Sequence, residues 1–510
     1  MVRRRSLAKL RQQVEPVSAQ VLGRLITNWQ GVVKPRRGLE ALLDSIESLQ
    51  GAALPASSLE TEILPARIQN YSPANLDTLM AASEVVWCGV ERLGERDGRI
   101  ALFLADHLSQ LWLPRTLFAA SQVIGHVGDG SADASRGAGT GVRHDEGLSK
   151  RALQIADFLR RNAASFFAAI HQAVGAGYPG ETNKALWDLV WRGLVTNDPF
   201  AAVRAFTARP ASRAKRLNTD PVLRGTFRSW RMASPSSHGR WCLIESRIIS
   251  PLSSTAMSAA LTQQLLNRYG LITRETAVAE NVPGGLSAVY PVLKAMEDGG
   301  RVRRGYFVAS VGATQFALPA ALDLLRWLRD DPETPEVVQL AATDPANLYG
   351  AILRWPSADS PDVAGSLARS VGASVILVDG ALAACWRKGS PQISVFLPDE
   401  EPNRSRVGRA LAAALREVAL RGRELAAPGD HHGRGLLIGE ICGLPTSVHA
   451  LAPFLREAGF VSGALGYHVP RAARSLWSVV RRPSFPGLNA EERQAAVWGE
   501  RLEGMRGSFD

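Results

Sequence analysis

The sequence has little cysteine and no long apolar run. Its four cysteines lie far apart without a CxxC pair, at positions 88, 242, 385 and 442. This spacing argues against a zinc cluster or a disulfide framework and favours a reducing cytoplasm. No apolar run reaches the ~18 residues that span a bilayer, and no hydrophobic signal region follows the basic residues 3–5. We therefore expect a cytoplasmic protein without a membrane partner.

A helicase motor is also missing. The Gly/Ser/Asp-rich segment 128–147 superficially resembles a phosphate-binding loop, but it lacks the G-K-[ST] ending and a preceding apolar strand. We interpret it as a mobile loop, so this chain cannot act as a helicase by itself. The sequence shows no metal-ligand spacing and no cofactor motif, and we expect neither a metal nor a cofactor.

Arginine dominates the positive charge. The formal net charge is +11, and only seven of the 59 basic residues are lysines. Guanidinium groups bind phosphate bidentately and stack on bases, which suits a nucleic-acid partner. A GC-rich genome, whose codons favour arginine and alanine, is the alternative explanation. The composition therefore favours a polyanionic partner without identifying it.

One stretch, residues 281–319, carries the strongest structural signal. Its apolar residues recur at helical spacing and predict a helix over residues 285–298, which Gly299-Gly300 then ends. Residues 301–308 follow as a short, very basic strand, and residues 314–318 return as a second strand. Helix, tight stop and basic hairpin form the second half of a winged-helix module, which typically holds nucleic acid with its helix and wing.

A pattern of apolar and small residues occurs three times. In each copy an apolar helix face ends at a small residue and passes into a β-branched strand residue. The copies are Leu76-Leu79-Ser83-Val85, Leu186-Leu189-Gly193-Val195 and Leu293-Met296-Gly300-Val302. Internal repeats indicate tandem modules, and coincidence among common residues is the alternative. We predict tandem winged-helix modules.

These signals predict an α+β multidomain fold, with tandem winged-helix modules followed by a small β-barrel-like domain. The barrel-like region contains a hairpin signal at residues 373–386 with an Asp-Gly turn. The predicted segments are winged-helix modules at 15–118, 148–209 and 241–330, a loop at 128–147, a basic linker at 210–240, the β-barrel-like domain at 331–470 and a polar tail at 471–510.

The predicted DNA-contacting residues lie mainly in the third module. They are Arg301, Arg303, Arg304 and Tyr306 of the wing, Gly285, Ser287, Tyr290 and Lys294 of the helix, and Asn183 and Lys184 of the second module. Phosphate contacts of this kind predict strong salt dependence and weak sequence preference. The linker 210–240 is either a further phosphate-binding segment or a solvated connection. Alternatively, the modules form a protein-binding scaffold whose arginines pair with acidic neighbours at an oligomer interface.

Several segments resemble the C-terminal region of the bacterial Lhr (large helicase-related) family. They are LQGAALPASSLETEILPARIQNY, ALWDLVWRGLVTND, GLITRETAVAENVPGGLSAVYPVLKAMEDGGRVRRGYFV, TQFALP and LVDGALAA, and they follow the family's order across residues 15–470. In that family the region follows a superfamily 2 ATP-dependent DNA helicase core. This chain begins at Met1 without the core. The resemblance therefore implies a split gene or a fragment, with a separately encoded helicase core as a partner.

The resemblance implies a function in DNA repair. The order of modules is similar to that of the AlkZ-type winged-helix DNA glycosylases, and uracil-DNA glycosylase activity and a homo-tetramer are associated with the Lhr C-terminal region. Our leading hypothesis is a nucleoid-associated region that binds single-stranded or junction DNA for a repair helicase. The alternative is a cofactor-independent glycosylase that removes uracil or a damaged base.

No catalytic residue for a glycosylase stands out. The AlkZ signature, Gln-x-Gln or Gln-x-Asp, is absent, and the nearest segment, 314–317, ends in alanine. A glycosylase needs a positioned carboxylate or amide and a pocket for the flipped base. The carboxylates considered are Glu275, Asp379, Asp430 and Asp510, of which Asp379 is most simply a hairpin-turn residue. The group Asp430-His431-His432 is either an acid/base or metal cluster or a solvated loop.

Overall fold

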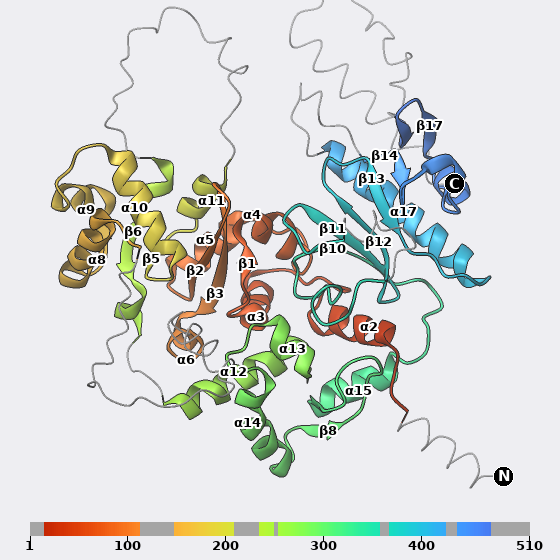
Figure 1. The fold of residues 1–510 in the computed structure, drawn as a ribbon, viewed down its shortest axis with the longest axis horizontal. Helices are drawn as coiled ribbons and strands as arrows, with labels where there is room; N and C mark the ends of the chain where they lie inside the picture. Colours follow the sequence, from red (N-terminus) through yellow and green to blue (C-terminus); the bar gives the residue numbers. More distant parts are fainter. Residues whose placement is uncertain are drawn as a thin grey trace, which may run out of the picture. The chain divides into compact units, whose positions relative to one another are not determined.

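The computed structural model describes residues 15–112, 147–208, 234–248, 253–356, 367–424 and 436–470. Residues up to His468 form one unit, and the elements below belong to it (Figure 1). The tail 471–510, Asp430-His431-His432 and Asp510 lie outside the described residues, as do most of the loop 128–147 and most of the linker 210–240.

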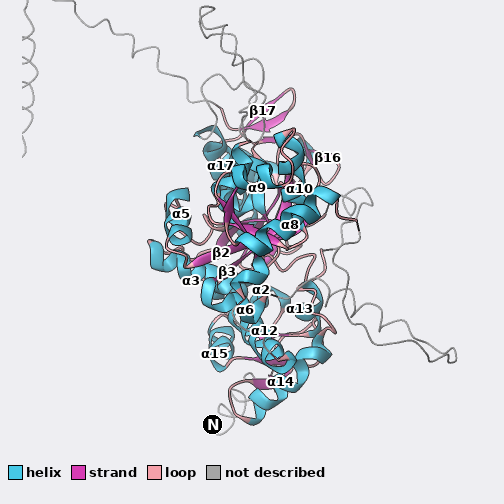
Figure 2. Cartoon of the chain, turned by 90° about the vertical axis from the view of Figure 1, so that its left-hand side faces the viewer, coloured by secondary structure: helices cyan, strands magenta, loops and turns pink. Residues whose placement is uncertain are grey.

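The first winged-helix module ends in a long two-stranded wing. Its elements are α3 (Leu39–Leu49), β1 (Leu54–Pro55), α4 (Ala56–Ser58), a π-helical turn (Leu59–Ile63), α5 (Pro73–Ala81), β2 (Val85–Leu93) and β3 (Asp97–Leu104), followed by α6 (Leu108–Leu111). Ser72 caps α5 by accepting from the Ala74 N–H, and proline occupies the first helical position. Figure 2 shows α3 and α5 beside β2 and β3.

The second module is completed by a strand that lies far along the chain. Its elements are α8 (Lys150–Asn162), β4 (Ser165–Phe166), α9 (Phe167–Ala173), α10 (Pro179–Trp191), β5 (Val195–Asn197), α11 (Ala201–Thr207) and β6 (Arg240–Leu243). β6 pairs with both β4 and β5. The predicted division ended this module at 209 and opened the third at 241, and these pairings correct it. Strand pairing is non-local, so no short-range pattern in the sequence indicates this partner.

The third module has α12 (Ser254–Tyr269), β7 (Leu271–Ile272), α13 (Arg274–Ala279), α14 (Leu286–Asp298), β8 (Arg303–Gly305) and β9 (Gln315–Ala317), and α15 (Pro319–Trp327) follows it. The sheet orders of the three modules are β1-β3-β2, β4-β6-β5 and β7-β9-β8. In each module the third strand therefore lies between the first and the second. The tandem winged-helix architecture is confirmed.

The sequence repeat corresponds to one recurring turn. Its small residues, Ser83, Gly193 and Gly300, have positive φ angles of 61°, 70° and 70°. The next residue in each copy donates its N–H to the carbonyl five residues back. The three bonds are Glu84 to Leu79 at 3.0 Å, Leu194 to Leu189 at 3.1 Å and Arg301 to Met296 at 2.8 Å. The left-handed conformation lets the strand start after only three or four residues beyond the helix, so the repeat is structural and not a coincidence.

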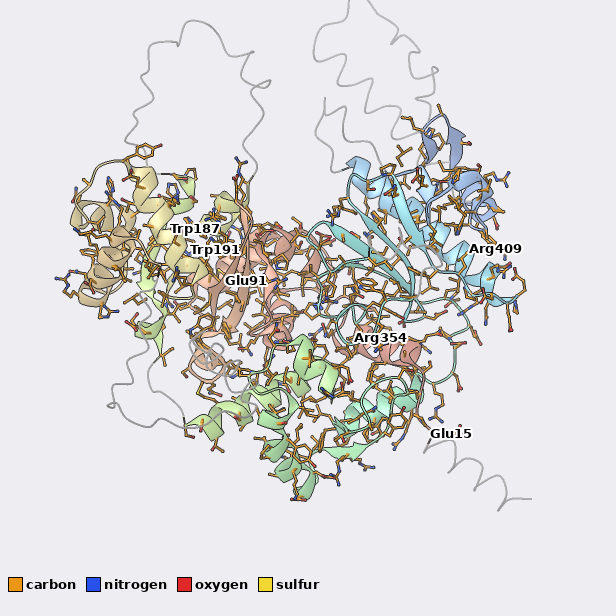
Figure 3. The ribbon with its side chains drawn as sticks, in the orientation of Figure 1. Glu15, Glu91, Trp187, Trp191, Arg354 and Arg409 are labelled. Atoms are coloured by element: carbon orange, nitrogen blue, oxygen red, sulfur yellow. The ribbon has the colours of Figure 1, made fainter. Side chains whose placement is uncertain are left out.

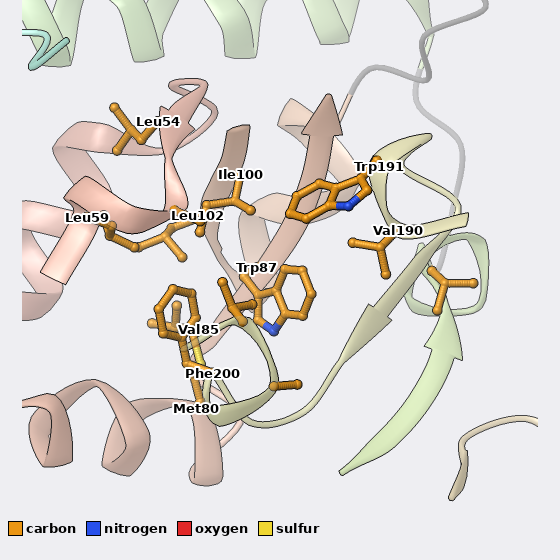
Figure 4. Close-up of a cluster of buried hydrophobic side chains, with 14 of the residues drawn as sticks. Leu54, Leu59, Met80, Val85, Trp87, Ile100, Leu102, Val190, Trp191 and Phe200 are labelled. Carbon is orange, nitrogen blue, oxygen red and sulfur yellow. The ribbon is translucent and has the colours of Figure 1, made fainter. Parts of the chain in front are cut away.

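An aromatic core joins the first two modules. Trp187 and Trp191 lie on α10 (Figure 3), and the ring of Trp87 on β2 stacks on that of Trp187 with centroids 6.2 Å apart. Phe200 contacts Trp87 edge-on at 6.5 Å, next to Met80 and Val85 (Figure 4). Trp87 is fully buried. It therefore belongs to the core and offers no surface for stacking bases.

The C-terminal region is a mixed sheet with a long helix on one face. The six-stranded sheet contains, in spatial order, β10 (Val337–Ala341), β11 (Ala373–Val378), β12 (Ala381–Arg387), β13 (Gln392–Val395), β15 (Glu440–Ile441) and β16 (Leu444–Pro445). Helix α17 (Asn403–Glu424) packs on β10, β11 and β12. A smaller sheet has the order β14 (Leu437–Ile438), β18 (Gly466–His468) and β17 (Val461–Gly463), next to α18 (Ala452–Glu457). Among the described residues neither sheet closes on itself, so the predicted β-barrel is not confirmed.

Helix α2 (Ala19–Trp29) lies in the core of this C-terminal sheet and the third module. Leu22, Leu25 and Ile26 are buried there. A Cβ added at Gly23 would lie only 2.2 Å from the carbonyl oxygen of Gly380, in the β11–β12 turn. α2 lies within the predicted bounds of the first module, residues 15–118, and packs its apolar face in the core of the C-terminal sheet and the third module.

Candidate nucleic-acid interface

Helix α14 presents a polar face to solvent. Val289, Leu293 and Met296 are buried on one side, while Ser287 and Lys294 are exposed on the other. Gly285 is the N-cap residue of this helix. Its φ of 61° suits glycine, and it offers no side-chain cap to the first N–H groups.

Two arginines of the wing point outward without a carboxylate partner. Val302 is buried, whereas Arg301 and Arg303 on either side of it are exposed. Among the described residues neither guanidinium has an ion pair. Both therefore stay fully available for a phosphate, and each binds it with a planar fork of N–H donors.

Arg304 connects the wing to the helix. Its Nε lies 3.3 Å from a carboxylate oxygen of Glu297, and its guanidinium donates to the Tyr290 hydroxyl at 3.2 Å. The Arg304 side chain is 48% exposed. It therefore positions the wing against α14 and still faces solvent, and Tyr306 beside it is 45% exposed.

The loop of the wing is held by Gln315. Its side-chain oxygen accepts from the N–H groups of Phe307 and Val308 at 2.8 and 2.9 Å, and its amide donates to the carbonyls of Val308 and Gly312 at 2.8 and 3.0 Å. The N-terminal segment also pairs with this loop, because Val17 donates to Phe307 and accepts from Ala309 at 2.8 Å each. The wing is therefore preorganised.

Replacing Gln315 with alanine is expected to cost about 2–4 kcal/mol, because it leaves the loop's N–H and carbonyl groups without partners. Chemical denaturation measures the loss, and hydrogen exchange across residues 306–314 is expected to rise. Thr314→Ala, on the exposed neighbour, is the control. Equal behaviour of the two variants would contradict the role of Gln315.

Two of the carboxylates considered for catalysis, Glu275 and Asp379, have structural partners. Glu275 accepts from the Gly312 N–H at 3.0 Å. Burial raises the pKa of Glu275, but the hydrogen bonds from Gly312 and Thr273 outweigh it and the net pKa is lowered. Asp379 lies in the β11–β12 turn, accepts from the Glu336 N–H and pairs with Arg406 at 2.5 Å. Neither is placed as a free general base.

The structure brings together the predicted residues of α14 and of the third wing, whereas Asn183 and Lys184 lie on α10 of the second module. Lys184 is exposed. The Asn183 amide donates to the Ser236 hydroxyl at 3.1 Å, so its donor is already engaged. The sequence identified the exposed arginines but missed Glu297 and the role of Gln315, which depend on contacts across the module.

A polar cavity of about 580 Å³ lies where the first module, the third module and the C-terminal region meet. Its lining includes residues 51–55, the carboxylates of Glu91 and Glu280, and Arg369. Glu280 accepts from the Tyr269 hydroxyl and pairs with Arg268, both at 2.5 Å. Burial and the Glu280 carboxylate raise the pKa of Tyr269 well above its usual value. The sequence prediction named neither glutamate.

The described residues offer no cluster of three or more His, Cys, Asp or Glu side chains suited to a metal ion. No described helix is long and apolar enough to cross a membrane.

The fold and the exposed basic wing define a protein of the tandem winged-helix class. Two of its modules match the winged-helix domain of the large helicase-related protein, at residues 17–105 and 251–337. The predicted resemblance to the C-terminal region of the Lhr proteins is thereby confirmed.

Two relatives share this resemblance over most of the chain. This chain is 36% identical to "Lhr helicase/ probable uracil glycosylase" of Mycolicibacterium smegmatis over 439 residues, which are 83% of this chain and 26% of the relative. It is 32% identical to "Lhr helicase/uracil glycosylase" of Escherichia coli over 508 residues, which are 91% of this chain and 29% of the relative. The chain thus spans less than a third of either relative.

The solved structure of the DNA glycosylase AlkZ from Streptomyces sahachiroi covers 84% of this chain and is itself covered completely. The TM-score is 0.42 and the identity 14%. This likeness is too weak to support an argument.

Proposed function

We propose that this chain binds DNA through its third winged-helix module, as the DNA-binding region of an Lhr-type repair helicase. The observation that carries the proposal is the pair of exposed, unpaired arginines, Arg301 and Arg303, on a wing that Gln315 holds in place. They lie next to α14, whose polar face carries Ser287 and Lys294. Since these groups recognise phosphate, single strands and junctions are bound with little regard to sequence.

The proposal includes a helicase core as a partner, because the relatives named as Lhr helicases extend far beyond the part that this chain matches. The Lhr resemblance further predicts a homo-tetramer and a place on the nucleoid. Light scattering of the purified chain measures its mass, and co-purification with a superfamily 2 helicase core tests the partner.

Lys294→Glu is the test of the DNA-binding proposal. Reversing this exposed charge is expected to weaken binding of single-stranded DNA roughly tenfold and to lower the slope of log Kd against log salt by about 1. Fluorescence anisotropy at several salt concentrations measures both. Lys34→Glu, an exposed lysine outside the module, is the matched control. Equal effects of the two changes would reject the interface.

The second candidate function is the removal of uracil or another base, and the polar cavity at the module junction favours it. Its 580 Å³ lie within the range of pockets that hold small ligands. The lining includes Tyr269, Ala279, Glu280 and Asn281 of the third module, which the first proposal places on DNA. A glycosylase holds its extruded base in such a pocket.

For this candidate, the purified chain is incubated with DNA that carries one uracil, and alkali then cuts abasic sites. Ala53 is exposed and lines the cavity. The substitution Ala53→Trp fills the space and is expected to abolish cleavage while DNA retention on a native gel is unchanged. Retention without uracil-dependent cleavage by the unaltered chain would rule out the glycosylase.

A further inference from the structure

A groove of about 1100 Å³ runs between β10 and α17, outside the winged-helix modules. β10 is an edge strand of the six-stranded sheet. Its residues Val338 and Leu340 are buried on the face that α2 helps to cover, whereas Val337 and Gln339 on the other face are exposed. Helix α17 packs on β10 but leaves Val337 and Gln339 exposed beside it. On the α17 side the groove is lined by the small side chains of Ala410, Ala413 and Ala414.

Four arginines line this β10–α17 groove: Arg406, Arg409, Arg416 and Arg421. They belong to one face of α17, which rises 1.5 Å per residue, so they extend along about 22 Å. At the 3.4 Å that each strand of a duplex rises per nucleotide, that length corresponds to at most roughly six nucleotides. The groove is thus long enough to contact several successive phosphates.

Two of these arginines are available for an anion. Arg416 and Arg421 are exposed and have no carboxylate partner among the described residues. Arg409, labelled in Figure 3, pairs with Glu457 at 3.1 Å. The side chains of Arg409 and Glu457 are 60% and 58% exposed. Such an exposed pair contributes little and exchanges readily for a phosphate. Arg406 is committed to Asp379 at 2.5 Å.

Acidic groups in the groove are few. Glu417 lies on the same helix face as the arginines and has no cation partner among the described residues, and Glu457 is the partner of Arg409. The guanidinium of Arg409 also lies 5.8 Å from the ring centroid of Phe454, which holds its plane in position. The lining contains no aromatic residue that bases could stack on, so any recognition here is of the backbone.

We propose that the β10–α17 groove is a second nucleic-acid site, which binds the phosphate backbone of a strand already held by the third module. This inference rests on the proposed DNA-binding function and adds a site in a region that the winged-helix matches do not cover. A strand that reaches both sites gains affinity through effective concentration, while a strand that fits only one does not.

The test compares the double variant Arg416→Ala, Arg421→Ala with the unaltered chain on two single-stranded oligonucleotides, of about 10 and about 40 nucleotides. We expect the variant to bind the long strand roughly five- to tenfold more weakly, with a salt slope lower by about 1.4, and to bind the short strand normally. Arg37→Ala, Arg326→Ala removes two exposed arginines from other elements and is the matched control.

The variant Glu417→Arg separates the proposal from a folding defect, since it adds a positive charge to the groove and is expected to tighten binding of the long strand. The proposal is overturned if either groove variant binds the long strand as tightly as the unaltered chain does. A loss of equal size on the short strand, or in the control pair, also overturns it, because the effect would then be one of net charge.

Failure of this site is distinguishable from failure of the proposed function. Short-strand binding depends on the third module alone, so its loss in Lys294→Glu supports that module whatever the groove variants show. Polyglutamate serves as a protein-like probe. If Glu417→Arg tightens binding of polyglutamate but not of DNA, the groove is a protein-binding surface and the proposal is wrong.

Discussion

Replacing Arg301, Arg303 and Arg304 together with alanine is expected to weaken binding of single-stranded DNA on the order of tenfold to a hundredfold at about 50 mM salt. Arg301 and Arg303 have no carboxylate partner among the described residues and are exposed. Their attraction to phosphate is therefore not offset by a broken ion pair. Each contact also releases counterions, so the salt slope should fall by about 2 for the triple variant.

The three single variants are expected to differ in whether they affect the stability of the wing as well as DNA binding. Arg304→Ala removes the contacts with Glu297 and Tyr290 as well as a charge, so part of its effect is a less ordered wing. Arg301→Ala and Arg303→Ala should lower the salt slope with no change in stability. Anisotropy titrations and thermal melts of the three variants distinguish these effects.

The control is a triple alanine variant of Arg37, Arg161 and Arg326, which are exposed and lie in other elements. It lowers net charge by the same amount. If it weakens DNA binding as much as the wing variant does, the attraction is general and the wing is not the interface. In that case the scaffold alternative, in which winged helices bind protein, would account better for the exposed arginines.

Removing Arg67 is expected to cost about 3–5 kcal/mol of stability. Its guanidinium binds Asp344 through two bonds of 2.8 Å each, and the two side chains are 1% and 0% exposed. Arg67 also donates to the Gln30 side chain at 2.6 Å and to the Ile63 carbonyl at 3.0 Å. One residue therefore joins the segment after α2, the first module and the loop after β10.

The size of this effect comes from desolvation. With Arg67→Ala, the Asp344 carboxylate stays buried and loses its cation, whereas removing both partners leaves no buried charge. The double variant Arg67→Met, Asp344→Leu is therefore expected to be more stable than either single variant. Urea denaturation followed by tryptophan fluorescence measures all of them. Single-variant losses below about 1 kcal/mol would show that the pair is not desolvated as described.

Local sequence sufficed for the elements that carry the DNA-binding proposal. Residues 285–298 were predicted as a helix with Val289, Leu293 and Met296 on one face, and α14 is Leu286–Asp298 with those side chains buried. The prediction worked because helical spacing, the Gly299-Gly300 stop and strand alternation act over a few residues. The Asp379-Gly380 turn was found for the same reason, and its φ angles are 52° and 81°.

The local pattern is misleading where a strand distant in sequence pairs with the segment. Residues 155–174 have the apolar spacing of one long helix, but α8 ends at Asn162 and the strand β4 precedes α9. Ala163 has a φ of 54° there, and β4 pairs with β6 across more than seventy positions. The helical pattern was real, yet the sheet of the second module required a strand in its middle.

The amino-acid order alone therefore specified the repeated helix-to-strand turn, the basic wing and the Lhr resemblance, because each is written in residues that are neighbours in the chain. Packing alone specified that α2 packs against the C-terminal sheet and that β6 pairs with strands of the second module. It also specified the hydrogen bonds from Gln315 to the wing and the cavity where the modules meet. These depend on which buried surfaces and backbone groups meet across hundreds of positions, and no short-range pattern encodes that choice.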